Sequence, residues 1–220
     1  MSGATPVLSE LQLDALTELV NLGVSNAALS LREMVKEEVA LSVPQVSLVT
    51  RSDAIARLGE REEKRLVGVH QDFEGDLKGR ALLIFPEARS LELVRAVVGG
   101  ELSLDELVEL EQEALAETGN ILLNACLGTM ANNLDRSLRI SLPEVVHGDG
   151  AEFFDLASCN HDGDSVLFIY INFAVRQRNI QGYIAMLLDF PSLEALKDLL
   201  NAFIERTGGT SAAFSPDVAS

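Results

Sequence analysis

Apolar residues recur along this chain with two different periods, and the period distinguishes helices from strands. Segments 91–98 and 193–203 carry leucine, valine and phenylalanine three and four positions apart, which predicts amphipathic helices. Other apolar runs are short, rich in β-branched residues and bounded by turn-forming residues, which predicts strands. The predicted strands are 39–48, 65–73, 78–85, 139–146, 166–174 and 179–188, with turns at Gly75 and Gly163.

The chain also contains an internal repeat. Segment 14–25 aligns without a gap on segment 113–124, at an offset of 99 residues, and a proline follows each copy in the same register, at Pro44 and Pro143. A duplication of this kind determines the architecture of the fold. We therefore expect two similar halves related by a pseudo-twofold axis.

A second correspondence matches segment 79–86 with segment 182–191, where the offset grows from 103 to 105 residues. Each half thus predicts a helix, several strands and a further helix. Because the strands come in runs rather than in strict βαβ alternation, the fold class is α+β, with two motif helices packed on a mainly antiparallel sheet. We expect one domain over 8–205, built from repeats 8–100 and 101–205, and a flexible tail over 206–220.

Each aligned helix carries a polar stripe. Its members fall within a sector of about 60° on a helical wheel. They are Asp14, Glu18, Asn21 and Ser25 in the first copy, and Glu113, Glu117, Asn120 and Asn124 in the second. A single stripe is typical of a solvated helix face, but its duplication in register favours a functional surface. The two prolines have an alternative role, since proline also directs the chain at a strand edge.

Charge and cysteine usage narrow the function classes. The chain holds 17 Lys and Arg against 34 Asp and Glu, a net charge of −17 that disfavours nucleic acid and anionic membrane as partners. The longest apolar run, 166–175, is too short to span a membrane, and the N-terminus does not resemble a secretory signal. Cys126 and Cys159 suit reduced thiols. These features predict a cytoplasmic protein.

The sequence offers little support for metal or metabolic chemistry. The three histidines, His70, His147 and His161, lack metal-ligand spacing. A dinuclear carboxylate site uses Glu-x-x-His, whereas the residue three positions after Glu18 and Glu117 is asparagine. The chain has neither a phosphate-binding glycine loop nor a nucleophile elbow. We expect no cofactor of its own.

The repeated pattern resembles a known family. An acidic residue or Ser, then Glu four positions on, Asn three positions later and Pro beyond it looks like the signature of the CheC, CheX and FliY family of response-regulator phosphatases. The run 120–132 with Ser141-Leu-Pro-Glu-Val-Val is especially similar to that family. The resemblance covers about residues 8–205. Two complete copies resemble CheC more than CheX, and Glu113 departs from the Asp or Ser usual at its position.

This resemblance implies a substrate, a chemistry and site residues. The substrate is a CheY-like receiver domain phosphorylated on aspartate, which brings its own Mg²⁺, and the deamidase CheD is a further candidate partner. Glu18, Asn21, Glu117 and Asn120 form the implied catalytic set, with Asp14 and Glu113 as partner-binding residues.

The roles within the catalytic set follow from chemistry. An asparagine amide can orient the attacking water without adding negative charge beside the phosphoryl group. The glutamates are better suited to pairing with the receiver's lysine. The alternative function is a module that binds receivers, or acts as a flagellar-switch adaptor, without hydrolysis.

Overall fold

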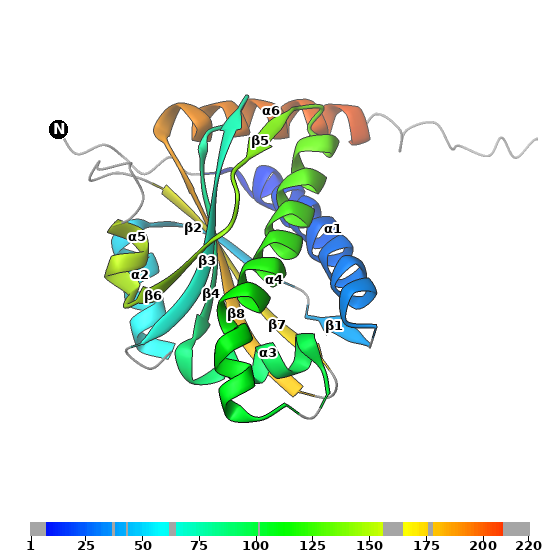
Figure 1. The fold of residues 1–220 in the computed structure, drawn as a ribbon. Coiled ribbons are helices and arrows are strands. Elements are labelled where there is room, and N and C mark those ends of the chain that lie inside the picture. Colours follow the sequence, from blue (N-terminus) through cyan, green and yellow to red (C-terminus); the bar gives the residue numbers. More distant parts are fainter. Residues whose placement is uncertain are drawn as a thin grey trace, which may run out of the picture.

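The computed structural model describes residues 8–36, 38–42, 44–61, 65–100, 102–155, 165–175 and 178–208. Its helices and strands form three layers around one sheet (Figure 1). Helices α1, α3, α4 and α6 cover one face, and α2 and α5 cover the other. In chain order the elements are α1 (Glu10–Val35), β1 (Val39–Leu41), β2 (Gln45–Thr50), α2 (Arg51–Arg61), β3 (Leu66–Gly75), β4 (Gly79–Pro86), a 3-10 turn η1 (Glu87–Arg89), α3 (Ser90–Val98), α4 (Leu104–Asn133), β5 (Leu138–Ile140), β6 (Glu144–Gly148), α5 (Gly150–Asp155), β7 (Ser165–Val175), β8 (Arg178–Leu188) and α6 (Phe190–Gly208).

The sheet joins the two halves by exchanging their short strands. Its order is β1-β7-β8-β4-β3-β5, with β2 also on β7 and β6 also on β3, and each of these pairs is antiparallel. Strands β1 and β2 of the first half therefore pair with the second half, and β5 and β6 pair with the first. This arrangement confirms the expected α+β class and the pseudo-twofold relation.

The central strands are buried on both faces. Along β4, Leu83 and Phe85 point into the core under α1 and α4, while Leu82 and Ile84 point into a smaller core under α2 and α5. All four side chains are inaccessible to solvent. A strand covered on both faces needs a continuous apolar run rather than an alternating one, which explains the long apolar stretches of the sequence.

Helices α1 and α4 begin with the same local device. Ser9 and Ser103 are the N-cap residues, and each forms a capping box with the residue three positions later, Gln12 or Glu106. The Ser103 hydroxyl and backbone lower the pKa of Glu106. These caps fix where the two stripe-bearing helices start.

The two helices also pack directly on each other. A Cβ added at Gly23 of α1 would lie 3.0 Å from the Cα of Cys126 on α4. Cys126 is a free thiol whose burial raises its pKa to about 12, so it is protonated at neutral pH, as expected for a reduced thiol. Cys159 lies outside the described residues, as does the turn predicted at Gly163.

The strands predicted over 39–48 and 139–146 were each expected to be continuous, and this is wrong. Each is divided in two, into β1 and β2 and into β5 and β6, and the break contains Pro44 or Pro143. Proline has no backbone N–H to donate to a strand ladder, which favours a break at that point.

Two short helices, α2 and α5, were not predicted. Helix α5 is stabilised by Asp149, whose side chain accepts from the backbone N–H of Glu152 at 3.0 Å, while Glu152 accepts from the backbone of Asp149 at 2.8 Å. The two helices pack on each other and on the second face of the sheet.

Two further expectations need correction. The tail was placed at 206–220, but α6 continues to Gly208, so 206–208 are helical and 209–220 lie outside the described residues. The alignment of Gly79 with Gly182 also fails. Phe73 pairs with Ile140 and Gly79, and Phe173 pairs with Leu41 and Ile180. Since Leu41 and Ile140 correspond in the repeat, the residues that pair with them, Phe173 and Phe73, correspond as well. Gly79 and Ile180, which pair with these two phenylalanines on the other side, therefore occupy equivalent positions in the two halves.

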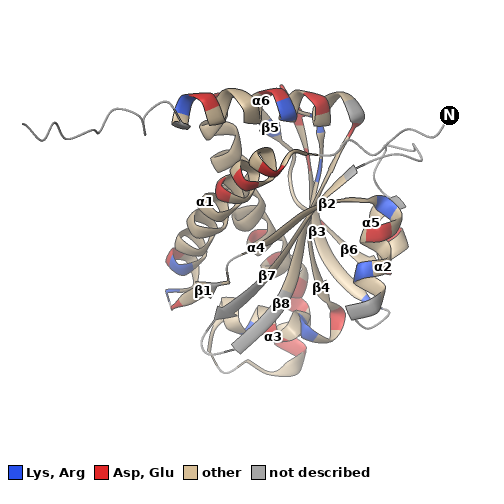
Figure 2. Ribbon diagram, turned by 180° about the vertical axis from the view of Figure 1, so that it is seen from behind, with Lys and Arg blue, Asp and Glu red and all other residues tan. Residues whose placement is uncertain are grey.

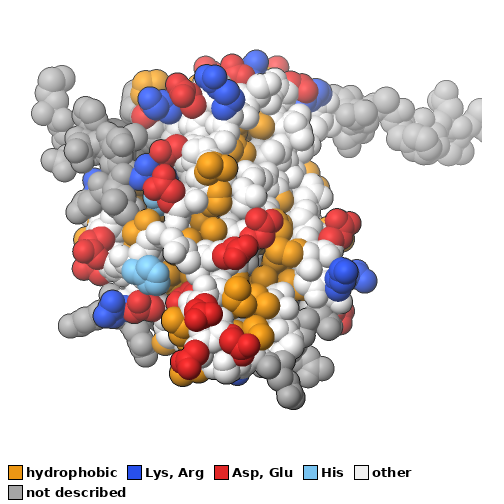
Figure 3. Space-filling view, in the orientation of Figure 1, with side chains coloured by type: hydrophobic (Ala, Val, Ile, Leu, Met, Phe, Trp, Pro, Cys, Tyr) orange, Lys and Arg blue, Asp and Glu red, His pale blue; other side chains and the backbone are white. Residues whose placement is uncertain are grey.

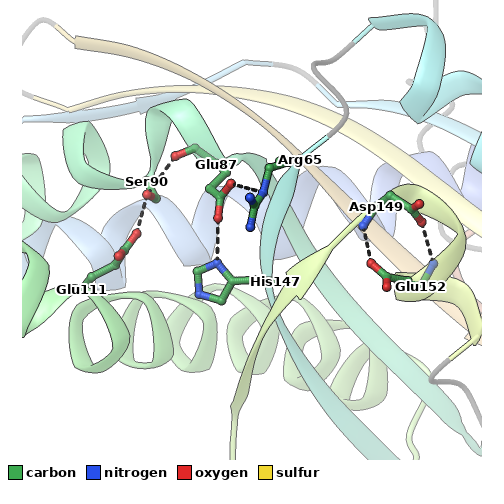
Figure 4. A network of polar contacts seen from close by, with 7 residues as sticks. All are labelled: Arg65, Glu87, Ser90, Glu111, His147, Asp149 and Glu152. Atoms are coloured by element: carbon green, nitrogen blue, oxygen red, sulfur yellow. Dashed lines mark hydrogen bonds and ion pairs between the residues drawn. The ribbon is translucent and has the colours of Figure 1, made fainter.

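A polar cluster links the halves at the start of β3 (Figure 4). Glu87 pairs with Arg65, Oε2 to Nε at 2.8 Å, and with His147, Oε1 to Nδ1 at 3.2 Å. The Ser90 hydroxyl lies 2.9 Å from the carbonyl oxygen of Glu87 and also donates to Glu111. Because His147 and Glu111 come from the second repeat, the cluster helps to hold the two halves in register.

Candidate functional site

The first polar stripe lies on the exposed side of α1. Asp14, Glu18 and Ser25 are exposed and Asn21 is half-buried, while the opposite side of the helix is in the core. Figure 2 shows acidic residues in the first half of α1, while the basic residue of this helix, Arg32, lies near its far end, next to Glu33. The structure therefore places the first stripe on an accessible helix face.

Asn21 opens into a groove that also contains the distant proline of its repeat. The groove has a volume of about 490 Å³ and runs between α1 and the segment around β1. Its lining residues are Asn21, Val24, Ser25, Ala28, Leu29, Arg32, Val39, Ser42 and Pro44. The structure thus brings Asn21 and Pro44 together, whereas Glu18 lies outside this lining. Within the described residues, the Asn21 amide has no hydrogen-bond partner.

The second stripe lies on α4. Glu113 and Glu117 are exposed, and Asn120 and Asn124 are half-buried. Figure 3 shows acidic and hydrophobic side chains interspersed on this face of the molecule. Leu142, which directly precedes Pro143, is 84% exposed and is a large apolar side chain in this region.

Asn120, unlike Asn21, is held by a network. Its Oδ1 accepts from Asn124 Nδ2 at 2.7 Å and from Gln71 Nε2 at 3.2 Å. Gln71 Nε2 also donates to the backbone carbonyl of Ser141 at 2.8 Å. Gln71 is 1% exposed, and its own Oε1 is buried without a partner. The network connects α4, β3 and the segment that precedes Pro143.

Strand β3, which contains Gln71, also carries titratable groups on either side of that residue. Hydrogen bonds from Arg80, with Nε 2.5 Å from Oδ1, lower the pKa of Asp72 below its ordinary 3.8. Burial, reinforced by Arg80, lowers the pKa of His70 below its ordinary 6.5. At neutral pH Asp72 is therefore charged and His70 neutral. The backbone of Asp72 forms two hydrogen bonds with Ser141. Its carbonyl oxygen accepts from the backbone N–H of Ser141 at 2.8 Å, and its own N–H donates to Ser141 Oγ at 3.0 Å.

Three residues near these sites were not predicted from the sequence. Gln71 is a polar residue at a core-facing position of an apolar strand, a signal that could have identified it. Arg32 is the first basic residue of the chain, yet nothing in the sequence places it beside Asn21. Leu142 could be found only as the neighbour of Pro143.

The described residues contain no group of three or more His, Cys, Asp or Glu side chains that could hold a metal ion. In the same part of the chain, none of the helices has the length and apolar character needed to cross a membrane.

Comparison with known proteins gives relatives of similar length. No protein-family model matches the sequence. The CheY-P phosphatase CheC of Bacillus subtilis is 25% identical over 202 residues, which cover 89% of this chain and 96% of that protein. The CheC1 protein of Halobacterium salinarum is 24% identical over 195 residues, covering 87% of this chain and 95% of that protein.

Solved structures show the same fold. The crystal structure of FliY from Thermotoga maritima covers 91% of this chain and 100% of its own, with a TM-score of 0.69 at 17% identity. The FliM middle domain of H. pylori covers 87% of this chain and 99% of its own, with a TM-score of 0.57 at 12% identity. The shared fold therefore extends over both halves of the chain.

Proposed function

We propose that this chain is a CheC-type member of the CheC, CheX and FliY family and that it hydrolyses the aspartyl phosphate of a CheY-like receiver domain in chemotaxis. The observation that carries the proposal is the duplicated stripe, with Glu18 and Asn21 on α1 and Glu117 and Asn120 on α4, one helical turn apart on exposed faces. Its support is the similarity to CheC of Bacillus subtilis over nearly the full length of both proteins.

The reaction requires a water molecule placed in line with the bond between phosphorus and the aspartyl oxygen, and it requires no nucleophilic side chain. The water oxygen forms a bond to phosphorus while the bond between phosphorus and the aspartyl oxygen breaks. The aspartate leaves as a carboxylate, and the proton of the water passes to phosphate or solvent. Catalysis of this transfer rests on positioning and on charge stabilisation. Asn21 and Asn120 supply the positioning, because an amide oxygen can accept from the water while its nitrogen donates to a phosphoryl oxygen.

The stripe carboxylates act in docking. Glu18 and Glu117 are exposed one turn from the asparagines, where each can pair with the receiver's active-site lysine. Asp14 and Glu113 extend the same stripe by a further turn and contact the receiver outside its phosphorylation site. Direct activation of water by these carboxylates would be opposed by the negative phosphoryl group.

The remaining components come from outside the chain. Mg²⁺ is bound by the receiver, where it neutralises charge on the phosphoryl oxygens, and this protein contributes no cofactor. We place the protein in the cytoplasm, with CheD as a further partner. We also propose that 8–205 is one domain made of repeats 8–100 and 101–205.

The test is the loss of phosphate from a phosphorylated CheY-like receiver with and without this protein. The double variant Asn21→Ala, Asn120→Ala should lose its acceleration by about 100-fold or more, the scale of one lost transition-state contact. It should remain folded, with a thermal midpoint lowered only by the loss of the two hydrogen bonds that Asn120 accepts. Asn132→Ala is the matched control, because Asn132 is an exposed asparagine of α4 outside the stripe.

Full activity in the double variant would exclude the mechanism. Binding of the phosphorylated receiver by the wild-type protein without any acceleration would instead favour the alternative function, a non-catalytic receiver-binding or flagellar-switch-like adaptor.

A further inference from the structure

We infer that Gln71 is a positioning residue that holds the Asn120 amide with its oxygen turned inward, so that the second site presents hydrogen-bond donors while the first site presents both donor and acceptor. The inference rests on the proposed function, in which the asparagine amide orients the attacking water. It adds a residue that the polar stripes do not contain.

The backbone of Ser141 fixes the polarity of the network. A carbonyl oxygen can only accept a hydrogen bond, so the Gln71 atom 2.8 Å from Ser141 O is the nitrogen. The same nitrogen lies 3.2 Å from the Asn120 amide, which therefore turns its oxygen toward Gln71. Asn124 Nδ2 then donates to that oxygen at 2.7 Å. The direction of every bond follows from one backbone group.

Both lone pairs of Asn120 Oδ1 are thus occupied by protein donors. Asn120 Nδ2, by contrast, is neither buried nor bonded in the described part of the chain. In this state Asn120 can donate to a phosphoryl oxygen but cannot accept from the attacking water. Orienting the water at the second site requires that one of the two bonds to Oδ1 be broken first.

The first site has no equivalent of this network. In the sheet, Gln45 of β2 pairs with Tyr170, and Glu144 of β6 pairs with His70. Because residues 45 and 144 correspond in the repeat, their partners Tyr170 and His70 correspond as well. Gln71, the residue after His70, therefore corresponds to Ile171, which is buried and apolar. Ser25 stands at the position of Asn124. Asn21 is therefore able to use both ends of its amide.

The test isolates the second site and removes the bond. In an Asn21→Ala background, Gln71→Ile introduces the residue type that Ile171 supplies beside the first site, and Gln71→Met keeps the length of the side chain without the amide. Both should raise kcat for the phosphorylated receiver by about five-fold, the factor that corresponds to one net hydrogen bond, with KM changed less. Unchanged or lower kcat in both variants overturns the inference.

Two controls complete the design. Adding Asn120→Ala to the Gln71→Ile variant should return dephosphorylation to the receiver's own rate, because the gain acts through Asn120, and a gain that survives this change overturns the inference.

The second control needs no activity. Hydrogen exchange by NMR should be slow for the side-chain amide protons of Gln71 and fast for those of Asn120 in the wild-type protein. The reverse order overturns the inference. If the wild-type protein does not accelerate dephosphorylation, the proposed function fails, and the exchange rates still decide how Asn120 is held.

Discussion

Glu18 and Glu117 each lie exposed one helical turn before an asparagine, and within the described residues neither forms an ion pair. Side chains of this kind add little to the stability of the fold. Their charge is thus available to a partner. At the scale of single residues, the proposed function assigns the carboxylates of the stripe to docking of the receiver and the amides to orientation of the water.

Replacing both glutamates by glutamine should weaken binding of the phosphorylated receiver by about two- to five-fold, the range of an exposed ion pair. The variant should also show a flatter dependence of Kd on salt, because salt screens the charge pair that has been removed. Titration at two ionic strengths measures both effects.

The matched control changes Glu205 to Gln and Asp198 to Asn, which removes the same charge from exposed positions on α6. Affinity that falls equally in the control variant would mean that overall charge, and not the stripe, governs docking.

At the scale of elements, helix α4 approaches the sheet closely at the residue before Asn120. A Cβ added at Gly119 would lie 2.5 Å from the Cβ and Cγ1 of Val69 on β3. Glycine at this position allows α4 to approach β3, and the approach brings Asn120 within hydrogen-bond distance of Gln71. The packing of one helix on one strand therefore sets the geometry of the second site.

Gly119→Ala should lower the free energy of unfolding by about 1 to 3 kcal/mol, the usual cost of overpacking a core. Gly128→Ala on the same helix is the control, since its Cβ would meet nothing within 4 Å. That control should gain about 0.5 to 1 kcal/mol, because alanine is the better helix former. Urea unfolding of the two variants measures both changes, and equal changes in the free energy of unfolding would contradict the role given to Gly119.

The elements also show what the sequence can predict. The long helices, the central strands and both stripes follow from periodicity and duplication, which are local signals. Helices α2 and α5 could not be predicted in this way, because their buried residues, such as Leu58 and Phe153, span only one or two turns. The burial of these residues depends on packing against the far face of the sheet, which a local pattern does not show. Gln71 stands out as a polar residue in an apolar strand, but its contacts could not be predicted, because its partners lie 49 and 70 residues away in the chain.

In the whole molecule the two halves are not separate bodies. Strands β1 and β2 pair with β7 of the other half, and β5 and β6 pair with β3. The main core contains residues from both repeats, and β4 and β8 form the seam between them. Each half thus supplies strands that complete the sheet of the other, and each site is built beside strands that both halves stabilise.

This exchange predicts that the chain unfolds as one unit. Calorimetric and van't Hoff enthalpies of unfolding should agree, and near- and far-UV circular dichroism should give the same midpoint. If the chain is divided after Gly100, fragments 1–100 and 101–220 should each lack native circular dichroism alone, because each would leave a long apolar strand, β3 or β7, without its edge partners. Mixed in equal amounts, the fragments should recover the native spectrum. A first fragment that folds alone with the stability of the whole chain would show instead that the repeats are independent domains.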